Sequence, residues 1–147
     1  LMRGEIIWQK SKGANANFAW GSWLSASNPV IRDIHEYCLI FSKDSMKNSS
    51  KGKSTIEKEE FMESTLSIWN ISPARAKKIG HPAPFPVELV KKFINLYSFK
   101  NNLILDPFMG SGSTAIASRM LDRDYIGYEI NPEYVEIANK RIKEEIS

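Results

Sequence analysis

Cysteine, histidine and long apolar runs are scarce in this sequence. A single cysteine, Cys38, excludes an intramolecular disulfide and a metal cluster built from cysteines. The two histidines, His35 and His81, are not spaced as metal ligands, so we expect no catalytic metal. The longest apolar stretches, Cys38–Phe41 and Leu103–Leu105, are far too short to cross a bilayer, and no cationic leader opens the chain. We therefore expect a cytoplasmic protein without a membrane partner.

The composition is that of a soluble globular domain. The chain has 147 residues, of which 42% are apolar and 25% charged, and this excludes disordered and fibrous classes. The length fits one domain and leaves little room for a second. Twenty Lys and Arg against 17 Asp and Glu give a net charge of +3, which is compatible with a polyanionic partner but too small to establish one.

Composition divides the chain into three regions, which we delimit as residues 1–43, 44–78 and 79–147. The first is β-leaning: Ile6–Trp8 indicates a buried strand, and 36–41 indicates a second strand that is apolar on both faces, as a covered sheet requires. A long polar connection joins the two strands.

The second region begins with a stretch, Ser42–Thr55, in which only Met46 is apolar, so this stretch buries too little surface to stay ordered alone. We interpret the region as a linker or a target-recognition insertion. A small apolar patch could anchor it, made of Phe61, Leu66, Ile68, Trp69 and Ile71.

The third region alternates helix and strand signals. Pro86 suits a helix start, Leu103–Leu105 a short buried strand, and Ser113–Leu121 a helix after a glycine-rich turn. Tyr125–Ile130 predicts another strand, and Asn131 can cap a last helix. This order predicts a parallel sheet wrapped by helices.

The turn between Asp106 and Thr114 is the most specific segment. It joins a strand to a helix, which is where open α/β sheets hold ligands. Gly110 and Gly112 permit unusual backbone angles and close approach of a ligand, and amides at the helix start favour an anionic group such as a carboxylate.

Three ligands compete for this turn. A P-loop needs Lys after the glycines, where Ser113 stands, so that reading fails. A nicotinamide dinucleotide fits the spacing Gly110, Gly112 and Ala115, but Asp106 would face its doubly charged pyrophosphate. S-adenosyl-L-methionine has no phosphate and carries an ammonium and a sulfonium, both of which a carboxylate attracts. The charge of Asp106 therefore favours S-adenosyl-L-methionine.

An acidic residue after the next strand supports a nucleoside ligand. Glu129 follows Asp106 by a little over twenty residues. In nucleotide-binding α/β folds, an acidic residue at a similar spacing accepts hydrogen bonds from the ribose hydroxyls. Ile130 beside it could pack on an adenine. Alternatively, Asp106 caps the turn and Glu129 is a solvated strand end. Taken together with the glycines between them, the two acids favour ligand binding.

Asp106–Thr114 followed by Tyr125–Ile130 resembles the cofactor-binding half of amino-group DNA methyltransferases, which methylate adenine N6 or cytosine N4. His81–Pro86 resembles the segment that precedes the glycine loop in the permuted β-type of these enzymes. Trp20–Trp23 and His35–Lys43 resemble the stretch after their catalytic motif. By this resemblance, S-adenosyl-L-methionine is expected to contact His81, Pro82, Phe85, Asp106, Phe108, Gly110, Gly112, Ser113, Thr114, Glu129 and Ile130.

One feature of the family is missing. Its catalytic motif is Asp, Asn or Ser followed by Pro-Pro and an aromatic, and this sequence contains no Pro-Pro pair. The resemblance therefore implies a Rossmann-like α/β methyltransferase fold that is circularly permuted and incomplete, with the catalytic strand and motif upstream of Leu1. We expect the C-terminal piece of a larger enzyme, or half of a split one, that transfers no methyl group alone and exposes a sheet edge to a homodimer partner or the missing fragment.

The expected substrate is double-stranded DNA with a flipped target base, as in restriction-modification enzymes. Two tryptophans could stack on bases and six cations could neutralise phosphates; these DNA-binding candidates are Trp20, Trp23, Lys47, Lys51, Lys53, Arg75, Lys77 and Lys78. The alternatives are a catalytically dead DNA-binding or regulatory module with the same fold and, less favoured, a nicotinamide-dependent oxidoreductase.

Overall fold

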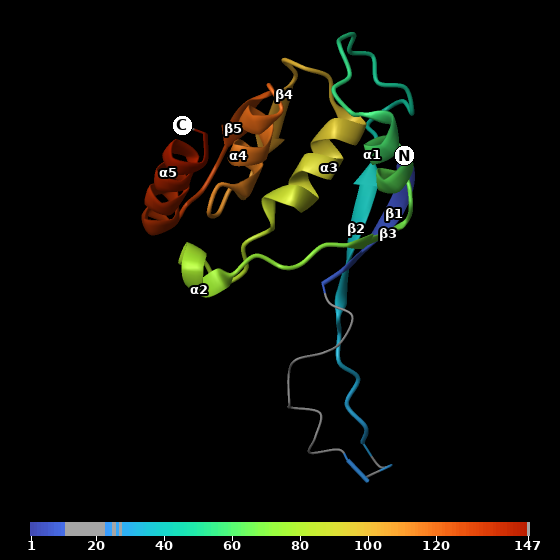
Figure 1. The fold of residues 1–147 in the computed structure, drawn as a ribbon, viewed down its shortest axis with the longest axis vertical. Helices are drawn as coiled ribbons and strands as arrows, with labels where there is room; N and C mark the ends of the chain where they lie inside the picture. Colours follow the sequence, from blue (N-terminus) through green and yellow to red (C-terminus); the bar gives the residue numbers. More distant parts are fainter. Residues whose placement is uncertain (11–22, 25, 27, 147) are drawn as a thin grey trace.

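The protein is an α/β structure in which two short sheets lie on either side of the helix Val87–Tyr97, labelled α3 in Figure 1. The computed structural model describes residues 1–10, 23, 24, 26 and 28–146. The first sheet has the order β2-β1-β3, with β1 (Met2–Gln9) antiparallel to β2 (His35–Phe41) and parallel to β3 (Ile68–Asn70). The second sheet pairs β4 (Leu103–Asp106) and β5 (Asp124–Gly127) in parallel.

Helices follow the strands in the order that an α/β protein requires. Their bounds are α1 (Lys58–Ser64), α2 (Ala76–Ile79), α3 (Val87–Tyr97), α4 (Ser113–Met120) and α5 (Pro132–Ile146). Helix α4 joins the parallel strands β4 and β5, which confirms the strand–helix–strand unit predicted for residues 103–130. The three small elements α1, β3 and α2 lie in the region that we interpreted as a linker or recognition insertion.

Local sequence sets the helix ends. Pro86 takes the extended N-cap position of α3 rather than its first turn, since its φ is −66° and its ψ 137°. Helix α5 begins after Asn131, whose side-chain Oδ1 accepts a hydrogen bond from the Glu133 backbone N–H at 2.9 Å. The predicted cap at Asn131 is therefore confirmed.

The core consists of one aromatic cluster and one small-residue contact. Trp8 and Trp69 are buried with Ile6, Ile71 and Leu89, and half-buried residues of α3 pack on them. The indole N–H of Trp8 donates to the Ile71 carbonyl at 2.8 Å, which satisfies that buried donor. Ala115, Ile116 and Ala117 of α4 and Ala138 of α5 are also buried. Small residues allow close helix approach beneath the turn before α4.

Only one face of each sheet is covered. Leu103 and Leu105 are 60% and 61% exposed, and Leu39 in the middle of β2 is 53% exposed. The prediction that these two strands are buried was therefore wrong. Figure 1 shows α3, α4 and α5 on the same side of the strands, and side chains that alternate along a strand point to opposite faces, so half of them meet no helix.

The stretch from Ser42 to Glu57 has no helix or strand, as its composition indicates, but it is tied to the second sheet. Thr55 Oγ1 donates to Asn95 Oδ1 on α3 at 2.9 Å. The guanidinium of Arg123, which is 1% exposed, donates from Nη1 to Thr55 Oγ1 at 2.6 Å and from Nη2 to the Ser98 carbonyl at 2.8 Å. A buried cation thus joins this segment to the end of α3 and the start of β5.

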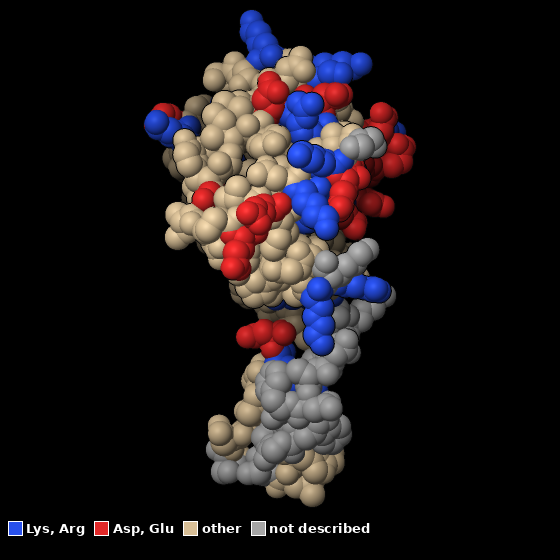
Figure 2. Space-filling view, turned by 90° about the vertical axis from the view of Figure 1, so that its left-hand side faces the viewer, with Lys and Arg blue, Asp and Glu red and all other residues tan. Residues whose placement is uncertain are grey.

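The side of the molecule that carries α5 has a mixed charge. Figure 2 shows blue and red side chains interspersed there, rather than an area of one sign. None of the helices in the described ranges has the length and apolar character that a membrane crossing requires.

Candidate functional site

The turn after β4 is shaped by the carboxylate of Asp106. Its Oδ1 accepts a hydrogen bond from the Phe108 backbone N–H at 2.9 Å, and its Oδ2 accepts one from Thr114 Oγ1 at 2.6 Å. The first bond tightens the turn and the second ties the strand end to the first turn of α4. The structure thus shows the capping role considered for Asp106, and the half-buried carboxylate places a negative charge at the mouth of the turn.

Two glycines of the turn have left-handed backbone angles. The φ of Gly110 is +52° and that of Gly112 is +85°, a region that other residues enter at a cost. A Cβ at Gly110 would lie 3.1 Å from His81 Nε2, and a Cβ at Gly112 would lie 3.0 Å from the Ala138 Cβ. The turn is therefore confined on one side by the segment before α3 and on the other by α5.

Glu129 reaches back to the same turn. β5 ends at Gly127, earlier than predicted, so Glu129 follows the strand and its side chain can bend toward Gly110. Its Oε1 accepts from the Asn131 backbone N–H and its Oε2 from the Gly110 backbone N–H, both at 2.8 Å.

These contacts keep the Glu129 carboxylate ionised. The backbone N–H of Asn131 lowers the pKa of Glu129 below its ordinary value, and the N–H groups of Gly110 and Ile130 and the charge of His81 act in the same direction. Each carboxylate oxygen can accept more than one hydrogen bond, so the group retains acceptor capacity toward a ligand.

His81 lies against the glycine turn, although it is 25 residues upstream of Asp106 in the chain. Its ring packs on Tyr134 of α5 with the centroids 4.4 Å apart, and its Nδ1 accepts a hydrogen bond from the Ala83 N–H at 3.2 Å. With Nδ1 used locally, the other ring nitrogen faces Gly110. The structure thus brings together His81, Gly110 and Glu129, three of the residues that the resemblance lists as expected cofactor contacts.

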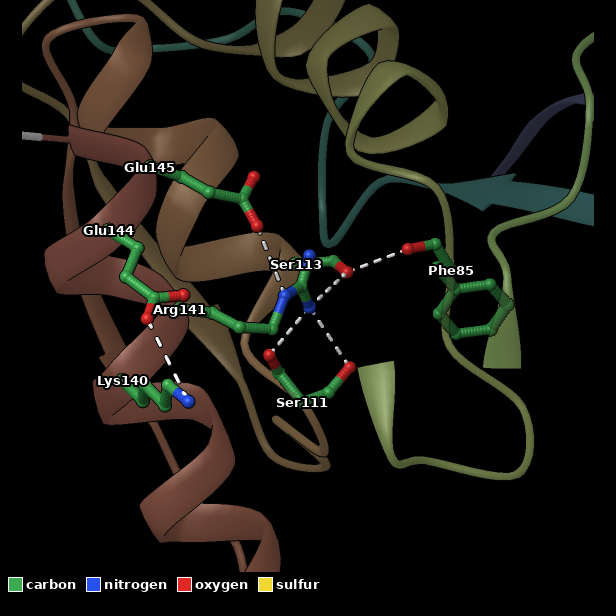
Figure 3. A network of polar contacts seen from close by, with 7 residues as sticks. All are labelled: Phe85, Ser111, Ser113, Lys140, Arg141, Glu144 and Glu145. Atoms are coloured by element: carbon green, nitrogen blue, oxygen red, sulfur yellow. Dashed lines mark hydrogen bonds and ion pairs between the residues drawn. The ribbon is translucent and has the colours of Figure 1, made fainter. Parts of the chain in front are cut away.

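Phe85 contacts the turn through its backbone. Its carbonyl accepts a hydrogen bond from Ser113 Oγ at 2.6 Å, while its ring points away from that contact (Figure 3). The ring lies 6.2 Å from the Trp8 ring, and with Pro82 the two aromatics line a cavity of about 300 Å³. This cavity lies at the end of β1, where Trp8 and Lys10 line it.

Sequence reasoning missed Arg141. This side chain of α5 donates from Nη1 to the Ser111 carbonyl at 2.7 Å and to Ser111 Oγ at 3.1 Å, and its Nε donates to Glu145 at 3.1 Å (Figure 3). Arg141 follows Ala138 by three residues, so both lie on the helix face that meets the turn. That spacing is the signal in the sequence that could have found it.

The mouth of the turn carries exposed apolar side chains. Phe108 is 86% exposed and Ile130 is 99% exposed, and they follow the two strand ends that carry Asp106 and Glu129. Exposed apolar groups beside fixed carboxylates suit a ligand with an aromatic ring, hydroxyls and a positive charge. A pyrophosphate would meet both carboxylates here.

The DNA-binding candidates that the structure describes lie on separate segments of the chain. Trp20 and the side chain of Lys78 lie outside what the structure describes. Trp23 is 68% exposed, and the other candidates are exposed on irregular segments or on α2; these are Lys47, Lys51, Lys53, Arg75 and Lys77. Among the described residues, no three His, Cys, Asp or Glu side chains are grouped so that they could hold a metal ion.

Comparison with known proteins identifies the class. The family model described as DNA methylase (N6_N4_Mtase) matches residues 1–140, and the chain belongs to this family. Among curated relatives, it is 31% identical over 152 residues to the type II methyltransferase M.MthZI of Methanothermobacter thermautotrophicus, covering 95% of this chain and 42% of the relative. It is 34% identical to M.BglI of Bacillus subtilis, covering 93% and 37%.

Solved structures show the same fold. The Thermus thermophilus protein TTHA0409, complexed with S-adenosyl-L-methionine, superposes with a TM-score of 0.78 at 28% identity, covering 99% of this chain and 54% of that one. The PvuII DNA methyltransferase, which is cytosine-N4-specific, gives a TM-score of 0.66 at 20% identity and supports the fold alone. The predicted methyltransferase-type α/β fold is therefore confirmed, while the permuted order stays a prediction. The chain spans about half or less of the length of these relatives.

Proposed function

We propose that this chain is the S-adenosyl-L-methionine-binding part of a cytoplasmic, site-specific DNA methyltransferase that modifies adenine N6 or cytosine N4. The observation that carries the proposal is the meeting of Asp106, Gly110, His81 and Glu129 around one strand–helix turn. Two structural relatives, TTHA0409 and M1.HpyAVI, were solved with S-adenosyl-L-methionine, and their similarity to this chain supports the choice of cofactor.

The residues at the turn fit the groups of this cofactor. Glu129 offers free acceptor capacity to ribose hydroxyls, and Phe108 and Ile130 offer apolar surface to the adenine. Asp106 attracts the ammonium and sulfonium, while the backbone N–H groups of Ser113 and Thr114 face the cofactor carboxylate. Pro82 and the Phe85 carbonyl position the segment that carries His81. When bound, the cofactor supplies an electrophilic methyl group, and the residues of this chain hold and orient it.

The target amine requires groups from outside this sequence. A base must leave the duplex to reach the methyl group, and the chain lacks the Pro-Pro-aromatic motif that accepts hydrogen bonds from the amine in this family. We therefore expect cofactor binding without methyl transfer by this chain alone. The missing motif equally fits a DNA-binding or regulatory module that never supports catalysis.

Titration calorimetry tests the proposal. The folded chain should bind S-adenosyl-L-methionine and S-adenosyl-L-homocysteine, and should transfer no tritiated methyl group to DNA. The absence of heat with both cofactors, while circular dichroism shows a folded chain, would contradict cofactor binding. DNA binding that is salt-dependent but unaffected by either cofactor would favour the regulatory module.

A further inference from the structure

The amino-acid end of S-adenosyl-L-methionine carries two opposite charges, an ammonium and a carboxylate. At the glycine turn (residues 106–114), the side chains of Asp106 and Glu129 attract the ammonium but repel the cofactor carboxylate. We propose that Arg141 is a positioning residue that offsets this repulsion: it lies behind the turn, and its positive charge stabilises the cofactor carboxylate through the turn. This inference rests on the proposed function and deepens it, because Arg141 acts on the cofactor without touching it.

The guanidinium of Arg141 contacts the turn where the chain enters α4. Its Nη1 donates to the Ser111 carbonyl at 2.7 Å and to Ser111 Oγ at 3.1 Å, and it lies 3.4 Å from Ser113 Oγ (Figure 3). The Ser111 carbonyl belongs to the peptide unit that leads into Gly112. The cation is therefore bonded to the backbone that bends at the second glycine of the turn.

The two serines lie inside the protein. Ser111 is 3% exposed and Ser113 5% exposed, and Ser113 Oγ donates to the Phe85 carbonyl at 2.6 Å. The stretch that Arg141 binds is thus enclosed between α5 and the segment before α3. Arg141 can act on a ligand only through this stretch, by its charge and by fixing the course of the backbone.

The charge of Arg141 is shielded from water and oriented toward the turn. Its side chain is 12% exposed, so solvent and salt screen it less than a surface cation. Its Nε donates to Glu145 Oε1 at 3.1 Å, and Figure 3 shows Glu145 and Ser111 on opposite sides of the guanidinium. Glu145 therefore compensates the charge in part, and the positive end of this ion pair faces the turn.

The start of α4 has a dipole of the same sign. The helix begins at Ser113, and the first backbone N–H groups of a helix favour an anion. Arg141 bonds to Ser111, so the two effects act on either side of Gly112. With Asp106 beside them, the turn offers both signs of charge within a few residues, which is what a zwitterionic amino-acid group requires.

Two ligands that differ only in the carboxylate test the proposal. Decarboxylated S-adenosyl-L-methionine keeps the nucleoside, the sulfonium and the ammonium of the cofactor. Titration calorimetry with both gives the carboxylate preference, which is the ratio of the two dissociation constants. The wild type should bind S-adenosyl-L-methionine more tightly, and Arg141→Gln should lower the preference about tenfold. A residue that merely supports the fold would weaken both ligands alike.

A second variant keeps Arg141 and changes the preference in the other direction. Glu145→Gln removes the carboxylate that compensates Arg141, so the preference should rise about threefold. Glu144→Gln is the matched control, because it removes the same charge from the next residue of α5, where Glu144 pairs with the exposed Lys140 at 3.9 Å (Figure 3). This control should leave the preference unchanged.

Two results would overturn the proposal: equal weakening of both ligands in Arg141→Gln, and equal preferences in Glu145→Gln and Glu144→Gln. If Arg141→Gln does not fold, the comparison of the two glutamate variants decides. The wild type reports on the proposed function separately. A folded wild type that binds neither ligand would contradict cofactor binding itself, whereas a wild type that binds both, with a preference that Arg141→Gln leaves unchanged, would contradict the role of Arg141 alone.

Discussion

The side chain of Asp106 contributes to both the shape and the charge of the turn. Its two oxygens accept hydrogen bonds from Phe108 and Thr114, so it orders the turn before any ligand arrives. Because the same carboxylate stays at the mouth, a phosphate is disfavoured and a cation is favoured. Asp106 can therefore cap the turn and at the same time favour a cationic ligand, as the sequence predicts.

Gly112 should tolerate no side chain. With φ at +85° and the Ala138 Cβ 3.0 Å from where a methyl group would lie, Gly112→Ala combines backbone strain with a tight contact. We expect a loss of about 1–3 kcal/mol in the free energy of unfolding, measured by urea denaturation. Gly4→Ala on β1 is the matched control, because no atom lies within 4 Å of its Cβ position. Equal losses in the two variants would contradict the argument.

Glu129 should make stability depend on pH in the acidic range. Backbone N–H groups that donate to its carboxylate lower the pKa of Glu129 below its ordinary value of 4.5, and the Asn131 N–H has the largest effect. The ionised group therefore stabilises the fold above pH 4.5, and this contribution decreases as the pH falls toward the folded-state pKa.

The unfolding free energies of the wild type and Glu129→Gln, measured from pH 7 down to pH 3, should differ most at neutral pH and converge at low pH. Lys100 likewise lowers the pKa of Asp122 through a hydrogen bond, but that effect is present in both proteins and cancels in the difference. A difference that stays constant over the whole range would show that Glu129 has an ordinary pKa.

The last helix holds the glycine turn through two kinds of contact. Ala138 lies beneath Gly112, and the guanidinium of Arg141 binds the Ser111 carbonyl and hydroxyl. The side chain of Arg141 is only 12% exposed, so these charge-assisted bonds are partly shielded from solvent. Helix α5 thus acts as a support for the turn from behind.

Arg141→Gln should lower the free energy of unfolding by about 1–3 kcal/mol, because it leaves the Ser111 carbonyl without its charged donor. Lys140→Gln is the control: the neighbouring Lys140 is 76% exposed and reaches only Glu144, at 3.9 Å (Figure 3). Chemical denaturation of both variants measures the difference. A Lys140→Gln variant as unstable as Arg141→Gln would contradict the assigned role.

The elements that flank the glycine turn were predictable from the sequence, whereas α2 and β3 were not. The helix after Pro86, the helix from Ser113 and the strand–turn–helix unit around them follow apolar spacing and turn residues. α2 and β3 have four and three residues, too few for a period to show, and tertiary contacts decide them. The site residues around Asp106 and Glu129 were predictable from local motifs, but the contact of Arg141 depends on how two helices pack.

At the level of the whole molecule, burial differs most from expectation. Strands that are apolar throughout predict a sheet covered on both sides, yet Leu39, Leu103 and Leu105 are exposed. An apolar side chain in a strand is therefore not by itself evidence that both faces of the sheet are covered within the described residues. The apolar side chains on the covered face pack on the helices, and those on the other face are exposed.

The basic residues of the irregular segment should govern DNA affinity. Lys51 and Lys53 are exposed on the 42–57 stretch and could neutralise phosphates. In Lys51→Gln/Lys53→Gln, the slope of log affinity against log salt for duplex DNA should fall by up to about 2, since each phosphate contact contributes about 0.9. Fluorescence anisotropy measures it, with Lys140→Gln as the control. An unchanged slope would remove these lysines from the interface.

The turn after β4 should select a positively charged methyl donor over a dinucleotide. Backbone NMR shifts on titration test it most directly, with S-adenosyl-L-methionine and NAD added separately. We predict shifts at Gly110, Gly112, Ser113, Thr114 and Glu129 at lower concentrations of S-adenosyl-L-methionine than of NAD, with little change in β2. Shifts at those amides that appear first with NAD, or none at all with S-adenosyl-L-methionine, would contradict the account.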